Sequence, residues 1–140
     1  MSFYSVRDVP EILITGRERE YFTWFIKNEA YDPTSISDDA IDEYIAKISQ
    51  PGGLRSLCNI YRETEANVRA NKESAQTKLT LPVLAIGSKD FIGAEVKSQM
   101  EAVCQAGSVT YKELNFGHQL AEECPEQLAK LFLDFLGQST

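Results

Sequence analysis

The residues best suited to chemistry are one histidine and one aspartate, each of which follows a predicted strand. His118 is the only histidine of the chain and comes shortly after a strand predicted over residues 109–114. Asp90 occupies the corresponding place after an apolar strand predicted over residues 81–87. Ligand sites of open α/β sheets lie beyond the carboxyl ends of the strands. The two side chains are therefore candidates for a general base and the acid that orients it.

Each of these residues also has a structural interpretation. A lone histidine is more often a structural or solvent-facing residue than a catalyst. An aspartate in the setting of Asp90, between a strand and a helix, is commonly a turn residue or a helix cap. Only the order of the two, an acid after one strand and a histidine after the next, raises the catalytic hypothesis above the structural one.

The elements that must position them divide the chain near residue 76. Residues 1–75 are predicted to form a helical segment, and residues 76–140 a strand–helix–strand–helix unit of a parallel sheet. Apolar residues at helical spacing predict helices over residues 17–30, 38–48 and 54–74 in the first part. In the second part, helices are predicted over residues 96–104 and 125–136. The expected fold class is α/β.

Two strands make an incomplete sheet. A parallel pair that is apolar on both faces needs neighbouring strands along its edges, and an unpaired apolar edge favours association with another chain. We therefore expect an intermolecular partner, most simply a second copy of the chain in a homodimer.

Composition excludes several classes of function. With 140 residues, a net charge of −7 and 43% hydrophobic residues, the chain is typical of one soluble domain that repels nucleic acid and anionic membranes. No signal peptide or membrane-spanning run is recognisable, so we expect a cytoplasmic protein. The spacing of Cys58, Cys104 and Cys124 encodes neither a disulfide framework nor a zinc site, and buried reduced thiols are expected.

Several segments resemble the C-terminal part of the α/β-hydrolase superfamily, and within it epoxide hydrolases and haloacetate dehalogenases. In the second half the resemblance lies in residues 77–91, 117–118 and 121–126. In the first half it lies in residues 16–25, 50–55 and 59–62, which resemble the helical cap, or lid, of that group. The resemblance extends from about residue 9 to about residue 136.

The resemblance implies roles for four residues. His118 matches the family's base and Asp90 its orienting acid, in the order in which this superfamily presents them. Tyr61 matches a cap tyrosine that donates its hydroxyl to an epoxide oxygen or lines a halide pocket. Trp24 stands where epoxide hydrolases carry a second tyrosine and the dehalogenases a halide-contacting tryptophan, and Thr23 replaces the histidine that precedes it in the latter. Packing within the cap is the alternative role for both aromatic residues.

The nucleophile of this family is missing from the sequence. Its elbow requires two glycines four residues apart, and no pair among the eight glycines has that spacing. We therefore expect the chain to begin at the cap, to be inactive alone and to need a complementary N-terminal hydrolase chain. The resemblance implies a small apolar substrate and no metal or organic cofactor.

Two other hypotheses remain open at this point. The chain could be a non-catalytic module that binds small apolar ligands or a protein partner, or a structural domain that dimerises through its strand edge. A ligand-induced rise in thermal stability that is unaffected by His118→Ala would favour the binding module. A stable monomer at micromolar concentration would count against the edge-strand hypothesis.

Overall fold

A computed structural model of the chain describes residues 2–137, which fold into two compact units. Of these residues, the first unit contains 2–25 and 37–74, and the second contains 26–36 and 75–137. The predicted division of the chain at residue 75 groups residues 26–36 with the cap, whereas in the structure they pack with the strands. The predicted division into cap and core itself stays a prediction.

The first unit is helical, as the apolar spacing predicts. Its elements are η1 (Phe3–Ser5), α1 (Val9–Ile14), α2 (Glu18–Asn28, whose last turn enters the second unit), α3 (Asp38–Ile48), α4 (Gly53–Arg62) and α5 (Thr64–Ser74). Helix α3 begins where a serine can cap it, since the Ser37 hydroxyl accepts a hydrogen bond from Ala40 N at 3.1 Å.

The structure differs from the predicted helices in two places. The helix predicted over residues 54–74 is two helices, because the chain turns at Glu63, whose N–H bonds back to Asn59 and Tyr61. Helix α1 lies in a segment for which the sequence predicts no helix. Its six residues are too short for a helical period to be recognised, although Pro10 sits in the first turn, where proline is tolerated.

The core of the first unit joins these helices. Ile14 of α1, Phe22 of α2, Ile41 of α3 and Cys58 of α4 are all nearly inaccessible to solvent. A half-buried ion pair adds to this core: Arg62 donates to both carboxylate oxygens of Glu11, at 2.8 and 2.9 Å. Burial of this apolar surface is what stabilises the helices, which would be marginal alone.

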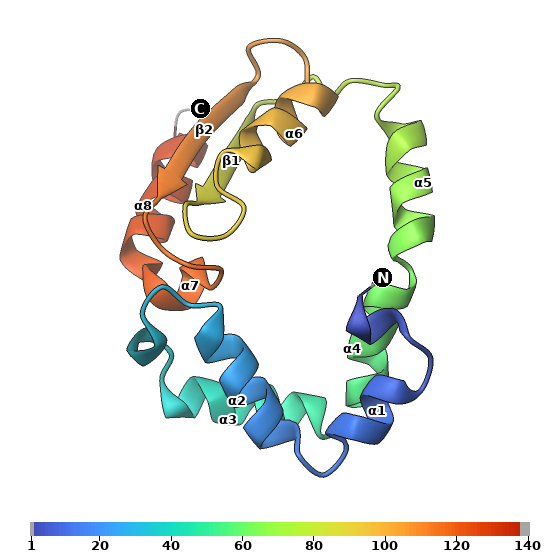
Figure 1. Cartoon of the computed structure of the whole chain (residues 1–140). Helices are drawn as coiled ribbons and strands as arrows, with labels where there is room; N and C mark the ends of the chain where they lie inside the picture. Colours follow the sequence, from blue (N-terminus) through green and yellow to red (C-terminus); the bar gives the residue numbers. More distant parts are fainter. Residues whose placement is uncertain (1, 138–140) are drawn as a thin grey trace. The chain divides into compact units, whose positions relative to one another are not determined.

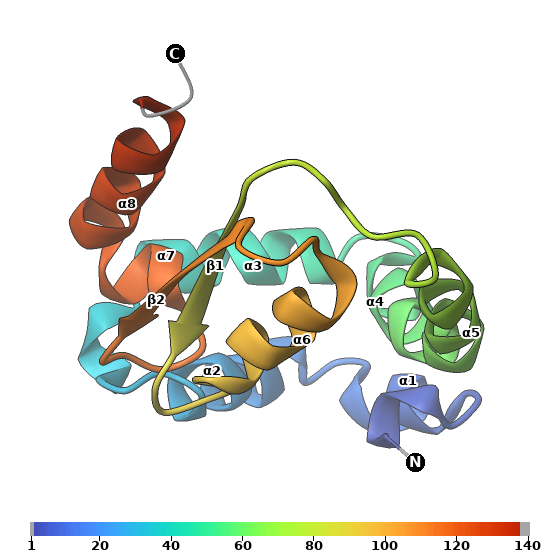
Figure 2. The ribbon, with the colours of Figure 1, turned by 90° about the horizontal axis from the view of Figure 1, so that it is seen from above.

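The second unit is a small parallel sheet with a helix on each face. Strands β1 (Val83–Ser88) and β2 (Val109–Leu114) pair in parallel from Val83 opposite Val109 to Ser88 opposite Leu114. The helices are η2 (Pro33–Ser35), α6 (Glu95–Val103), α7 (Leu120–Glu123) and α8 (Pro125–Gly137). Figures 1 and 2 show α6 and α8 on opposite sides of the two strands. The predicted α/β class and the strand–helix–strand–helix order are confirmed.

Two further expectations can be compared with the structure. Cys58, Cys104 and Cys124 are free and buried, as predicted. Among the helices of residues 2–137, none combines the length and the apolar character needed to cross a lipid bilayer.

Candidate active site

The two strand-end loops that carry Asp90 and His118 are bonded to each other. The buried Ser88, at the end of β1, donates its hydroxyl to Phe116 O at 2.7 Å and lies against Gly117 O. The next two backbone amides extend this row of hydrogen bonds, which we call the seam between the two loops. Lys89 N donates to Leu114 O at 2.9 Å, and Asp90 N donates to Phe116 O at 3.3 Å. The parallel register of β1 and β2 brings the loops together, as the sequence predicts.

The side chains of Asp90 and His118 themselves remain open to solvent. The imidazole of His118 packs on the ring of Phe91, with 4.0 Å between centroids and 34° between planes. Within the described part of the chain, no hydrogen bond or ion pair joins the Asp90 carboxylate to the imidazole. The structure thus places the predicted base and acid on adjoining loops, and their catalytic roles stay a prediction.

A carboxylate that the sequence analysis did not single out holds the His118 loop. Glu123, at the end of α7, accepts hydrogen bonds from the backbone of Gly117 at 3.0 Å, Gln119 at 3.0 Å and Tyr31 at 2.7 Å. Because α7 has only four residues, Glu123 also lies in its first turn, where an acid that accepts from the N-cap amide is a recognisable capping signal. Its bond to Tyr31 spans 92 residues of sequence, and no local pattern could indicate it.

The segment after α2 also contacts the His118 loop directly. His118 N donates to Glu29 O at 2.8 Å. Gly117 has no room for a side chain, because a Cβ atom there would meet the backbone of residues 29–31 well inside van der Waals distance. Residues 29–31 and the loop around His118 therefore form one closely packed piece of backbone.

In the first unit, Tyr61 belongs to an aromatic cluster. Its ring stacks on that of Tyr4, with centroids 4.8 Å apart, and the Tyr4 hydroxyl shares a hydrogen bond of 2.9 Å with Tyr21. Burial raises the pKa of Tyr4, and the hydrogen bond with Tyr21 raises it further. Tyr61 itself is 38% exposed, whereas Tyr4 is buried. The sequence analysis assigned no role to Tyr4, which comes from the short η1 helix.

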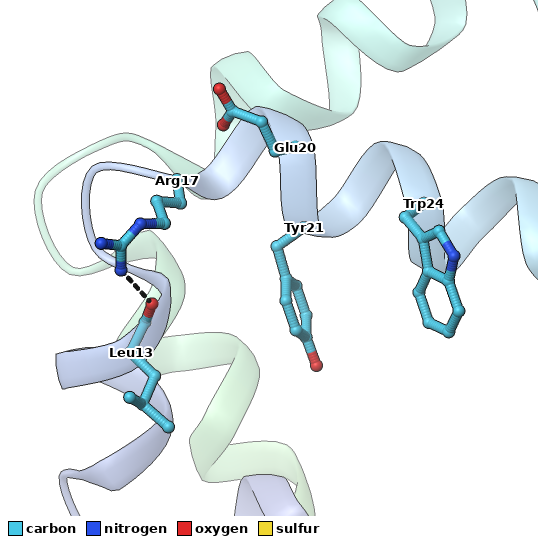
Figure 3. A pocket seen from close by; sticks show the side chains of 5 residues that line it. All are labelled: Leu13, Arg17, Glu20, Tyr21 and Trp24. Atoms are coloured by element: carbon cyan, nitrogen blue, oxygen red, sulfur yellow. Dashed lines mark hydrogen bonds between the residues drawn. The ribbon is translucent and has the colours of Figure 1, made fainter.

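Trp24 lines an open pocket of about 300 Å³ on the same unit. Figure 3 shows the side chains of Tyr21 and Trp24 pointing from α2 toward the same side of the helix. In this view Leu13 lies on the other side of Tyr21 from Trp24, and Glu20 points away from them. Arg17 closes one end, where its guanidinium donates to Leu13 O at 3.4 Å. Since Trp24 is 65% exposed, it is not a core residue of the first unit, and its indole can contact a ligand. Tyr21 connects this pocket to the cluster of Tyr4 and Tyr61.

Metal ligation has no support from these residues. Within residues 2–137, no group of three or more histidine, cysteine, aspartate or glutamate side chains is placed to hold a metal ion. The polar groups at the strand ends are a hydroxyl, a carboxylate and an imidazole, which are suited to hydrogen bonding and proton transfer.

Comparison with known proteins places these features in a family. No protein-family model matches the chain. The soluble epoxide hydrolase of Corynebacterium sp. (strain C12) is 32% identical over 108 residues, which are 75% of this chain and 36% of that protein.

Two solved structures have the same fold. Cfl2 of Burkholderia cenocepacia matches with a TM-score of 0.85 and 37% identity over 95% of this chain and 45% of that one. The epoxide hydrolase CorEH matches with a TM-score of 0.87 and 28% identity over 99% of this chain and 50% of that one.

This chain spans between about a third and a half of the length of the proteins it matches. The region of this chain that matches holds the helices of the first unit, strands β1 and β2 and the loops of Asp90 and His118. The chain is therefore the C-terminal part of an α/β-hydrolase and is similar to epoxide hydrolases.

Proposed function

We propose that this chain supplies the base, its orienting acid and the substrate-contacting lid of an epoxide hydrolase. The observation that carries the proposal is the bonded seam between the two strand ends, which brings the loops of Asp90 and His118 together. The relatives named as epoxide hydrolases favour an epoxide over a haloacid as the substrate class.

The reaction would proceed through an ester. A carboxylate attacks one carbon of the epoxide, the carbon–oxygen bond of the ring breaks, and the released oxygen takes a proton from the Tyr61 hydroxyl. His118, oriented by Asp90, then removes a proton from a water molecule that attacks the carbonyl of the ester. The products are a diol and the regenerated carboxylate, while the proton held by His118 returns to the tyrosine through solvent.

The attacking carboxylate would come from outside these 140 residues. No two glycines of this sequence are four residues apart, as a nucleophile elbow requires, and the matched proteins are about twice as long as this chain. Strand β1 pairs only with β2 in the described sheet, so its other edge can take a further parallel strand. We propose that a complementary N-terminal hydrolase segment pairs there and carries the nucleophile.

A chimera tests this proposal. The chain replaces the matched part of CorEH, and diol formation from styrene oxide is followed together with the intact mass of the protein. We expect the 140-residue chain alone to form no diol and the chimera to form it. In the chimera with His118→Ala, the ester should accumulate as a mass increase of one substrate, because attack on the epoxide precedes the step that needs the base.

Glu126→Gln is the matched control, since Glu126 lies exposed in the first turn of α8 and should leave turnover unchanged. A folded chimera whose turnover survives His118→Ala contradicts the proposal. So does diol formation by the purified chain alone that is lost on His118→Ala, because the chain would then be a complete enzyme.

A second function, binding of small apolar ligands without turnover, is favoured by the open pocket at Trp24. Trp24 is the only tryptophan of the chain, so its fluorescence reports on this pocket alone. In the binding module, an aromatic ligand such as styrene glycol quenches this fluorescence and raises the melting temperature equally in wild type and His118→Ala. A ligand effect that depends on His118 supports the hydrolase instead.

Association with a second copy is the alternative to a complementary segment. Pairing of two β1 edges would give a dimer mass by sedimentation at micromolar concentration. A monomer under those conditions excludes the homodimer and leaves the complementary segment as the partner.

A further inference from the structure

We infer that Glu123 positions His118, and that it does this by hydrogen-bonding the histidine loop to the segment that follows α2. This inference deepens the proposed function, because it concerns the base of the same site. It rests on the hydrogen bonds of one carboxylate and on the packing around Gly117.

The two oxygens of Glu123 divide the task. Oε1 accepts from Gln119 N, directly after the histidine, at 3.0 Å. Oε2 accepts from Gly117 N, directly before it, at 3.0 Å, and from Tyr31 N at 2.7 Å. The backbone on both sides of His118 is thereby held by one side chain, and the same side chain reaches the segment after α2.

Other contacts leave the loop little freedom once this carboxylate is in place. His118 N is bonded to Glu29 O at 2.8 Å, and the backbone of residues 29–31 fills the space beside Gly117. On the opposite side, Ser88 holds the carbonyls of Phe116 and Gly117. The imidazole direction is then set by the backbone, with the Phe91 ring as its only aromatic support among the described residues.

The arrangement requires a carboxylate rather than an amide. Glutamine has one acceptor oxygen, and its other terminal group is a donor that would face a backbone N–H. Glu123→Gln should therefore keep the hydrogen bonds on one side of His118 and lose those on the other side. Glu123→Ala should lose the hydrogen bonds on both sides. Glu126→Gln removes the same charge a short distance along the chain and serves as the control.

The test uses the full chain and nuclear magnetic resonance, because His118 is its only histidine. We expect Glu123→Ala to speed amide hydrogen exchange at Tyr31, Gly117 and Gln119 by tenfold or more. We expect Glu123→Gln to do so on one side only, either at Gln119 or at the other two amides. In both variants the imidazole protons should lose the ring-current shift that the Phe91 ring causes.

Two results would overturn the inference. If exchange is unchanged in both variants, the hydrogen bonds do not hold the loop. If exchange rises while the imidazole signals stay as in wild type and in Glu126→Gln, the carboxylate only caps α7. Should Glu123→Ala fail to fold, Glu123→Gln, which keeps an acceptor, decides alone between these outcomes.

Asp90→Asn separates this inference from the proposed function. If Asp90 orients the base, its replacement shifts the equilibrium between the two imidazole tautomers and hence both ring-nitrogen signals. Unchanged ring nitrogens in Asp90→Asn, together with a lost ring-current shift in the Glu123 variants, would refute the His118–Asp90 pair while retaining Glu123 as the positioning residue.

Discussion

The predicted lid residues and the predicted strand-end residues are held in place by different kinds of contact. Tyr61 and Trp24 lie on helices whose neighbours are other side chains, namely aromatic rings and the ion pair of Glu11 with Arg62. The loops of Asp90 and His118 are held through their backbone, by Ser88, Glu123 and the carbonyl of Glu29.

This difference indicates how each region tolerates change. A side-chain contact in the lid can be replaced by another of similar volume at modest cost. A backbone hydrogen bond cannot be replaced by choosing another side chain. A substitution that moves a strand-end loop therefore also moves the backbone groups that are hydrogen-bonded to that loop. Substrate preference should accordingly be easier to alter than the geometry of the base.

The largest effect is expected at Gly117, where the backbone contact leaves no space. Gly117→Ala should lower the free energy of unfolding by about 3 kcal/mol, because the new methyl group displaces residues 29–31. Urea denaturation followed by circular dichroism measures the change. Gly137→Ala, at the end of α8 with open space around the position, should change stability by less than about 1 kcal/mol. Equal stabilities of the two variants would contradict this account.

The next effect concerns the ion pair of the lid unit. Glu11→Gln should destabilise the protein by about 2 kcal/mol, because the side chain of Arg62 is only 16% exposed and its guanidinium loses a charged partner. The exposed pair of Arg19 with Asp42 is the matched control, and Asp42→Asn should cost less than about 1 kcal/mol. A cost for Glu11→Gln no larger than that of Asp42→Asn would show that burial adds nothing to the pair.

The same ion pair predicts a dependence of stability on pH. The hydrogen bond from Arg62 lowers the pKa of Glu11 to about 2, against 4.5 for a free glutamate. Because the folded pKa is the lower one, the stabilisation is complete above pH 4.5 and is lost as the pH falls toward 2. The stability difference between wild type and Glu11→Gln should therefore shrink across this window. A difference that is the same at pH 6 and at pH 2.5 would disprove the assignment.

A smaller effect is expected from the tyrosine cluster. Tyr4→Phe keeps the stack on Tyr61 and removes only the hydrogen bond with Tyr21, so the cost should be about 1 kcal/mol. Thermal unfolding at neutral pH measures it. Tyr31→Phe, at a ring that is 65% exposed, should leave the melting temperature unchanged. If both variants melt alike, the hydroxyl pair contributes nothing to the lid.

The smallest effect is a gain in stability. The hydroxyl of Thr23 is buried without a hydrogen-bond partner among the described residues, so Thr23→Val should stabilise the first unit by up to about 1 kcal/mol. Thr23→Ser keeps the hydroxyl and loses a methyl group, and should not stabilise it. Loss of stability in Thr23→Val would indicate that a water molecule satisfies the hydroxyl in solution.

The sequence allowed the strand-end loops to be predicted for a simple reason. Parallel strands place their carboxyl ends at one edge, so residues soon after each strand, such as Asp90 and His118, must lie near one another. The spacing of Ile41, Ile45 and Ile48 is amphipathic and predicts which face of α3 is buried, and Ile41 is indeed nearly inaccessible to solvent.

The remaining features depend on contacts between distant parts of the chain. Nothing near Tyr31 indicates that its amide meets Glu123, which is 92 residues away. The exposure of Trp24 could not be predicted either. Helix α2 carries aromatic residues on several of its faces, and periodicity alone does not say which face is covered. Tyr4 lies in a three-residue helix that has no recognisable period.

The grouping of residues 26–36 with the strands has a consequence for anyone who exchanges lids between relatives. A lid cut out as one continuous stretch up to residue 75 would carry away Glu29 and Tyr31, to which the histidine loop and Glu123 are bonded. The unit to transplant as a predicted lid is discontinuous: residues 1–25 and 37–74 can be exchanged, while the eleven residues between them must stay with the recipient's own histidine loop.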